Sequence, residues 1–97
     1  MYINVLYEGD YCDCDIIFVP DSIGDKIEQY AQQFCDWLNT PYVSNDYYVT
    51  INGKEYLSLE TDGFVRWLNH YICKDQCLAH IVKQHTNLVP SYKVIEF

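Results

Sequence analysis

The chain has few basic residues for its length. Its 97 residues include 6 Lys and Arg against 14 Asp and Glu, which gives a formal net charge of -8. Proteins that bind nucleic acid directly use Lys and Arg to neutralise its phosphates. The charge balance therefore argues against direct nucleic-acid binding.

Long apolar runs are absent as well. The longest uninterrupted one, residues 16–19, is far shorter than the ~20 residues needed to cross a bilayer. Met1 is not followed by a basic segment and an apolar stretch, so no signal peptide is expected. The five cysteines are odd in number, which suits reduced thiols better than a disulfide framework. These features predict a cytoplasmic protein with no membrane association.

Glycine and proline are scarce, with four and three residues. The glycines stand singly, so the phosphate-binding P-loop, the dinucleotide-binding G-x-G-x-x-G and the nucleophile pattern G-x-S-x-G are all missing. No cofactor is expected, and a non-enzymatic function is favoured.

Apolar and aromatic residues, by contrast, are plentiful. Hydrophobic residues make up 49% of the chain and aromatic residues 16%, with ten tyrosines. Acidic disordered chains are poor in these residues, so disorder is excluded. At this length the chain is expected to form one domain, residues 1–97.

The hydrophobic pattern predicts strands at residues 1–8, 12–19, 47–51, 54–59 and 92–97. Asn52-Gly53 between two of these runs is the preferred type I′ hairpin turn. Three-four spacing predicts a helix over 22–39, started by a capping box at Ser22 and Asp25.

A second helix is predicted to begin at Thr61, and a third segment to run from Asp75 to about Asn87. The resulting order, β-β-α-β-β-α-(α)-β, predicts an α+β fold. We expect a small two-layer domain with a mainly antiparallel sheet of about five strands and two to three helices.

Residues 12–15 read Cys-Asp-Cys-Asp within a predicted strand. Alternation sends both thiols to one face, which they share with Ile16 and Phe18, and both carboxylates to the other. The cysteines are therefore predicted to lie in the core, with Asp13 and Asp15 facing solvent.

His70, Cys73, Cys77 and His80 have the residue types of a zinc site at short spacing. A straight helix places the two histidines ~15 Å apart, too far for one ion. A helix break near residue 74 brings Cys73, Cys77 and His80 together, with a thiol of the segment 12–15 completing the set. A small zinc-stabilised interaction module is therefore an alternative function.

A thiol-dependent hydrolase is a further alternative. Its nucleophile and base meet in space rather than in sequence, so Cys35 paired with His70 or His85 fits the requirement. No local motif supports such a pair.

The negative charge is confined to the first half of the chain. Residues 1–48 hold nine acidic residues and one basic residue, whereas residues 49–97 hold five of each. Either these residues only keep the domain soluble, or they form a docking surface for a basic partner. Asp13 and Asp15, ~7 Å apart on a strand, resemble successive phosphates.

Tyrosines beside the acidic residues favour the docking surface, because Tyr is enriched at interfaces. The predicted partner-binding residues are Glu8, Asp10, Tyr11, Asp13, Asp15, Asp21, Asp25, Glu28, Tyr47 and Tyr48.

The leading hypothesis is a non-enzymatic acidic module or inhibitor that docks on a basic, nucleic-acid-binding surface of another protein. In size and charge the chain resembles the small acidic inhibitors of phages and mobile elements, including nucleic-acid-mimicking anti-CRISPR proteins. The resemblance is one of composition and implies no residue roles; a phage origin would place the protein in the host cytoplasm. A homodimer sealed by exposed tyrosines or a free sheet edge is compatible with each hypothesis.

Overall fold

The computed structural model describes residues 1–7, 9–40, 48–57 and 61–97. Its main element is a four-stranded sheet made of β1 (Tyr2–Leu6), β2 (Cys14–Phe18), β5 (His80–Thr86) and β6 (Lys93–Glu96). The strand order is β5-β2-β1-β6. β2 is antiparallel to both of its neighbours, whereas β1 and β6 are parallel. The predicted α+β class is confirmed, with a mixed sheet.

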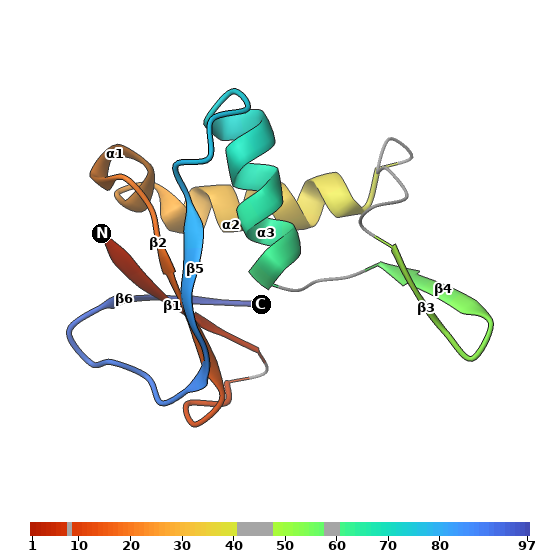
Figure 1. The fold of residues 1–97 in the computed structure, drawn as a ribbon, viewed down its shortest axis with the longest axis horizontal. Helices are drawn as coiled ribbons and strands as arrows, with labels where there is room; N and C mark the ends of the chain where they lie inside the picture. The colour runs from red at the N-terminus through yellow and green to blue at the C-terminus, as the bar shows by residue number, and fades with distance from the viewer. Residues whose placement is uncertain (8, 41–47, 58–60) are drawn as a thin grey trace.

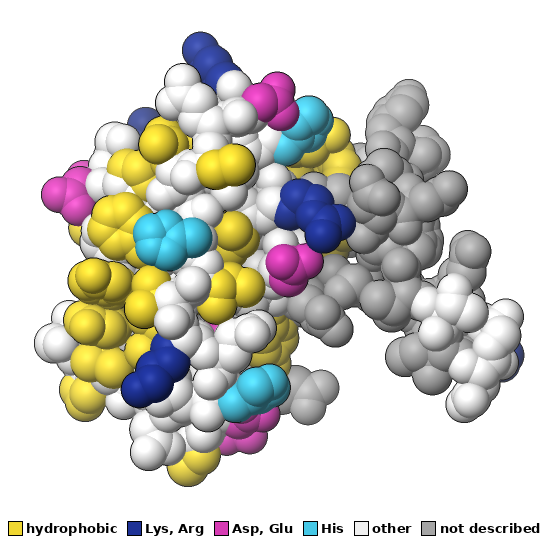
Figure 2. Space-filling view, in the orientation of Figure 1, with side chains coloured by type: hydrophobic (Ala, Val, Ile, Leu, Met, Phe, Trp, Pro, Cys, Tyr) yellow, Lys and Arg dark blue, Asp and Glu magenta, His cyan; other side chains and the backbone are white. Residues whose placement is uncertain are grey.

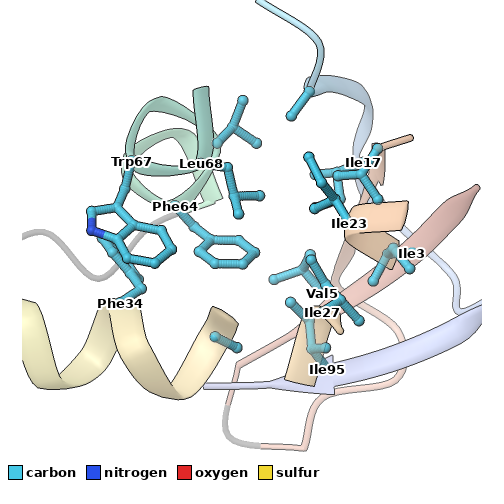
Figure 3. Packing of buried hydrophobic residues seen from close by; sticks show 14 of the residues in the cluster. Ile3, Val5, Ile17, Ile23, Ile27, Phe34, Phe64, Trp67, Leu68 and Ile95 are labelled. Carbon is cyan, nitrogen blue, oxygen red and sulfur yellow. The ribbon is translucent and has the colours of Figure 1, made fainter. Parts of the chain in front are cut away.

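Helices cover one face of this sheet (Figure 1). They are α1 (Asp21–Gly24), α2 (Ile27–Leu38), and α3 (Thr61–Trp67), which continues into the π-helical turn η2 (Leu68–Ile72). The core lies between the two layers (Figure 3) and contains Ile3, Val5, Ile17 and Ile95 from the sheet and Ile23, Ile27, Phe34, Phe64, Trp67 and Leu68 from the helices. None of the helices in the described ranges is long and apolar enough to cross a membrane.

The predicted helix over 22–39 is two helices, and the capping box is wrong. The residue before α1 is Pro20, and neither α1 nor α2 has a side-chain cap hydrogen bond. Proline fixes a φ that suits the start of a helix, and the Pro20 carbonyl accepts hydrogen bonds from the Ile23 and Gly24 N–H groups. Gly24 then lies so close to Met1 that a Cβ would collide with the Met1 side chain, and the chain turns before Ile27.

The Asn52-Gly53 turn is confirmed. Both residues have positive φ, 51° and 78°, as a type I′ turn requires. The turn joins β3 (Tyr48–Ile51) to β4 (Lys54–Leu57). This hairpin forms its own two-stranded sheet (Figure 1), so the sheet of about five strands is corrected to four within the described residues.

The predicted third helix, from Asp75 to about Asn87, is wrong. Lys74 and Asp75 have φ of 52° and 65°, so the chain leaves the helix at these positions. Residues 80–86 form β5, in which Ile81 lies opposite Ile17 of β2. Pairing with the sheet overrides a weak helical spacing, because the β-branched residues Ile81 and Val82 suit a strand equally well.

The predicted orientation of β2 is wrong too. Ile17 belongs to the core cluster below the helices, and alternation places Asp15 on that same face. Cys14 is buried on the opposite face, whereas Cys12 is exposed and Phe18 is half-buried. β2 is central and both of its faces are covered, so alternation could not tell which face meets the helices.

Candidate protein-binding surfaces

Asp13 and Asp15 form a polar network with residues far away in the sequence. Asp15 accepts a hydrogen bond of 2.5 Å from the Thr61 hydroxyl and one of 3.2 Å from the His85 backbone N–H. Tyr7 donates to Thr61, 2.7 Å away, because the Thr61 proton already points to Asp15. Asp13 contacts His85 Nδ1 at 2.7 Å. Asp15 is therefore held in place, and only Asp13 projects from the surface.

The network lines a shallow pocket of ≈ 250 Å³, completed by Asp62 and Gln84. A cationic His85 beside Asp13 cancels part of the negative charge there. In the view of Figure 2 the acidic side chains stand singly and form no continuous patch. The surface around Asp13 and Asp15 is therefore a weaker mimic of successive phosphates than the sequence predicts.

The hydrogen bond that the His85 ring donates to the Asp13 carboxylate raises the pKa of His85, and the negative charge of Asp13 adds to this effect. Burial opposes the rise in pKa, and the charge of Asp15 makes the smallest contribution to it. A raised pKa means that the folded state favours the protonated ring. The stabilisation is fully present below the ordinary His value of ~6.5 and is lost as the pH rises through the raised value. The His85 side chain is 80% exposed, so solvent screens this contribution to stability strongly.

Asp13→Asn is expected to lower the titration midpoint of the His85 ring, because the substitution removes the hydrogen-bonded charge. NMR titration of the ring protons measures the midpoint directly. Asp10→Asn is the matched control, since Asp10 accepts a hydrogen bond from the Cys12 N–H instead. Equal midpoints in the wild type and Asp13→Asn contradict the Asp13–His85 contact.

The predicted acidic residues of the helical region, Asp21, Asp25 and Glu28, do not extend this line. Asp21 lies beyond the far end of β2, beside the N-terminal amine of Met1 at 3.3 Å. An extended strand separates its ends by ~3.3 Å per residue, so Asp13 and Asp21 are roughly 20 Å or more apart. Asp25 follows α1, and Glu28 lies in the first turn of α2.

The predicted tyrosines are described only in part. Tyr11 is 63% exposed, and its carbonyl accepts a hydrogen bond from the Leu88 N–H. Glu8 and Tyr47 lie outside the described residues, as does the side chain of Tyr48. Tyr11 is thus the one predicted aromatic contact that the structure places on the surface.

A second acidic surface lies along α2 and β6, and the sequence pointed to only half of it. Glu28 and Asp36 are exposed and eight residues apart, so they follow one stripe of α2. Glu96 of β6 lies across a groove from Glu28. Asp25 lies between α1 and α2, three residues before Glu28. We call Asp25, Glu28, Asp36 and Glu96 the acidic face.

The groove of the acidic face has a volume of ≈ 260 Å³ and runs between α2 and β6. Glu28, Ala31, Gln32 and Cys35 of α2 line one side of it, and Val94, Ile95, Glu96 and Phe97 line the other. The lining therefore combines apolar side chains with Gln32 and the two carboxylates of Glu28 and Glu96. No family model, curated protein or solved structure significantly matches the chain.

The outer face of the sheet carries a row of four rings that the sequence did not indicate. Tyr2 stacks on Tyr92 with ring centroids 5.3 Å apart, and it packs edge-to-face with Phe18 with ring centroids 5.6 Å apart. Phe18 in turn lies 5.2 Å from the His80 ring. Figure 2 shows hydrophobic side chains gathered beside β5. Phe18, predicted to lie in the core, instead contributes to this apolar surface.

The predicted zinc ligands lie in different surroundings. Cys73 is buried below the helices, whereas Cys77 and His80 are exposed and His80 stacks on Phe18. His70 bonds to Asp75 at 2.5 Å. Across the ranges that the structure describes, no three Cys, His, Asp or Glu side chains converge as metal ligands. The arrangement gives the zinc module no support.

The thiol-dependent alternative gains no geometric support either. Burial raises the pKa of Cys35, and the charge of Asp36 adds to the effect, so the thiolate is disfavoured. Cys35 lines the groove beside β6, whereas His85 lines the pocket of Asp13 and His70 bonds to Asp75. A nucleophilic thiol needs a base within hydrogen-bond reach and a lowered pKa.

Proposed function

We propose that the chain is a non-enzymatic protein-binding module whose acidic face docks on a basic surface of a partner protein. One observation carries this proposal: within the described residues, Asp25, Glu28 and Glu96 have neither a hydrogen bond nor an ion pair through their side chains. Asp36 accepts one hydrogen bond, from neutral Gln32. Exposed like charges repel one another, and cations from a partner relieve that repulsion.

The class of partner follows from the charge. A protein surface basic enough to complement this face is typical of nucleic-acid-binding proteins, which present Lys and Arg to phosphates. A module that occupies such a surface competes with the nucleic acid and inhibits the partner. A nucleic-acid mimic of the anti-CRISPR kind belongs to this class. Negative potential also steers the encounter and raises the association rate at low salt.

The experiment measures whether the protein displaces a fluorescent DNA duplex from protamine, a basic nucleic-acid-binding protein. We expect displacement by the wild type, weaker at high salt. Glu28→Lys combined with Asp36→Lys is expected to weaken displacement by about tenfold or more, because each reversal replaces an attraction of ~1 kcal/mol in water with a repulsion.

The matched control is Asp62→Lys combined with Asp75→Lys, which changes the net charge equally. Asp62 and Asp75 already face Arg66 and His70 and lie away from the acidic face. This variant is expected to displace DNA nearly as well as the wild type. Equal losses in both variants would indicate a response to net charge alone and would overturn the proposal of a defined docking face.

A further inference from the structure

Strand β6 is an open edge of the main sheet. It stands last in the strand order, and within the described residues it pairs only with β1. The Phe97 N–H donates to the Leu6 carbonyl, 2.9 Å away. Successive residues of a strand direct their backbone groups to alternate sides, so the N–H and C=O groups of Val94 and Glu96 point away from β1. These groups can pair with one more strand.

The groove of the acidic face follows this open edge. α2 forms its other wall, with Ala31 and Cys35 facing the strand. A chain laid along β6 therefore meets backbone hydrogen-bonding groups on one side. On the other side it meets a helix surface that is apolar at Ala31 and polar at Glu28 and Gln32. The edge strand β6 and the adjoining helix α2 together form the kind of groove in which an extended peptide adds to a sheet.

The opposite edge of the sheet is less suited to pairing. β5 pairs with β2 through two register shifts. His85 within β5 has φ of 53°, outside the extended region. Bulges and irregular backbone prevent another strand from continuing the ladder. Of the two edges, β6 is the regular one.

Charge selects the occupant of the groove. The carboxylates of Glu28 and Glu96 in the groove lining favour a basic segment. A second copy of the chain would bring the same two carboxylates, and a net charge of -8, against those already there. Like charges placed opposite each other across paired strands are destabilising. The groove therefore suits a basic partner better than another copy.

We propose that an extended segment of a basic partner protein adds to β6 as a fifth strand of the main sheet and lies in the groove beside α2. This inference rests on the proposed function and specifies its mode of binding. Main-chain hydrogen bonds to Val94 and Glu96 supply affinity that is independent of the sequence. The side chains of the added strand supply the selectivity.

The alternation of a strand defines the sequence of this segment. Every second side chain points to the helix side, above Ala31 and Cys35, and is small or apolar. The side chains between them point to the outer face, where Glu96 pairs with Lys or Arg. The segment is therefore one in which basic and apolar residues alternate.

The probe is a fluorescent peptide, acetyl-Lys-Val-Lys-Val-Lys-Val-amide, with the Glu-Val analogue as its charge control. Val94→Pro removes an N–H that faces the open edge and leaves the hydrogen bonds to β1 in place. It is expected to weaken binding of the Lys-Val peptide by about tenfold, the size of one lost main-chain hydrogen bond. Val94→Thr keeps the N–H and the branched shape, so it is expected to bind as the wild type does.

A second measurement needs no variant. Peptide binding is expected to slow hydrogen exchange at the Val94 and Glu96 amides of the wild type, with no change at Val82 in β5. Unchanged exchange at both amides in the bound state overturns strand addition. The wild type could instead dimerise with increasing concentration, and Val94→Pro could abolish this dimerisation. Such a result would assign the β6 edge to a second copy of the chain and would also overturn strand addition by a partner.

The two proposals fail in different ways. If Val94→Pro binds the peptide as the wild type does while Glu28→Lys combined with Glu96→Lys weakens it, strand addition is wrong and the acidic docking face stands. If the wild type binds no Lys-Val peptide but displaces DNA from protamine, strand addition is again wrong. If the wild type neither binds the Lys-Val peptide nor displaces DNA from protamine, both the acidic docking face and strand addition are wrong.

Discussion

Phe34→Ala is expected to lower the free energy of unfolding by about 3–5 kcal/mol, a large fraction of the stability of a domain of this size. Phe34 is fully buried on α2. Its ring centroid lies 5.4 Å from that of Phe64, 5.7 Å from Trp67 and 6.0 Å from Phe97. Truncation of Phe34 leaves a cavity. The rings of Phe64, Trp67 and Phe97 cannot move to fill this cavity, because α3 and the last residues of the chain hold them in place.

Urea unfolding followed by tryptophan fluorescence measures this loss. Phe34→Leu keeps most of the buried apolar volume and is expected to cost well under half as much. Gln33→Ala, at an exposed position of the same helix, is expected to stay within about 0.5 kcal/mol of the wild type. A loss of less than 1 kcal/mol in Phe34→Ala, at an unchanged m-value, contradicts the packing described for this ring.

Elements with a strong local signal could be predicted from the sequence. The Asn52-Gly53 hairpin depends on two residues that tolerate positive φ, and both adopt it. The helix around Phe34 depends on apolar spacing, and α2 follows that spacing from Ile27 to Leu38. In these cases neighbouring residues along the chain carry the information.

Elements that depend on contacts between residues far apart in the sequence could not be predicted. Leu78, Ile81 and Val82 fit a helical spacing, yet Ile81 pairs with Ile17 of β2 in the sheet. Neither Lys74 nor Asp75 is a glycine, so their left-handed backbone gives no sequence signal for the end of η2. Tertiary pairing decided the outcome.

The candidate surfaces, too, could be predicted from the sequence only in part. Acidic residues were found from composition, but which of them lack partners depends on the fold. Asp15 meets Thr61 across 46 positions of the sequence and His85 across 70. Glu96 belongs to the neutral half of the chain and reaches the acidic face only because β6 lies beside α2. Charge counts along the sequence cannot reveal such neighbours.

Asn4 is a buried polar residue that composition and periodicity do not single out. It is fully buried on the outer side of β1. Its Nδ2 donates to the carbonyls of Val89 at 2.9 Å and Tyr92 at 3.3 Å, and its Oδ1 accepts from the Val89 N–H at 3.0 Å. The side chain therefore pairs with Val89 as a neighbouring strand would and fixes residues 87–92 over the sheet.

Asn4→Leu is expected to lower the free energy of unfolding by about 2–4 kcal/mol, because it leaves one backbone N–H and two carbonyls without their partner in a partly buried site. The same experiment on Asn87→Leu, at an exposed position, is expected to cost about 0.5 kcal/mol or less. Hydrogen exchange at the Val89 amide is expected to accelerate in Asn4→Leu even under conditions where the variant stays folded.

Asn4→Asp separates lost hydrogen bonds from lost volume, since it keeps the shape of the side chain. A carboxylate cannot donate to the Val89 and Tyr92 carbonyls, and it brings a charge into a buried site between them. Its protonated form regains one donor. The loss of stability in Asn4→Asp is therefore expected to be larger at about pH 7 than at about pH 4, whereas the loss in Asn4→Leu stays nearly constant. A pH-independent difference between Asn4→Asp and the wild type contradicts donation by Asn4, and with it the way in which residues 87–92 are held against the sheet.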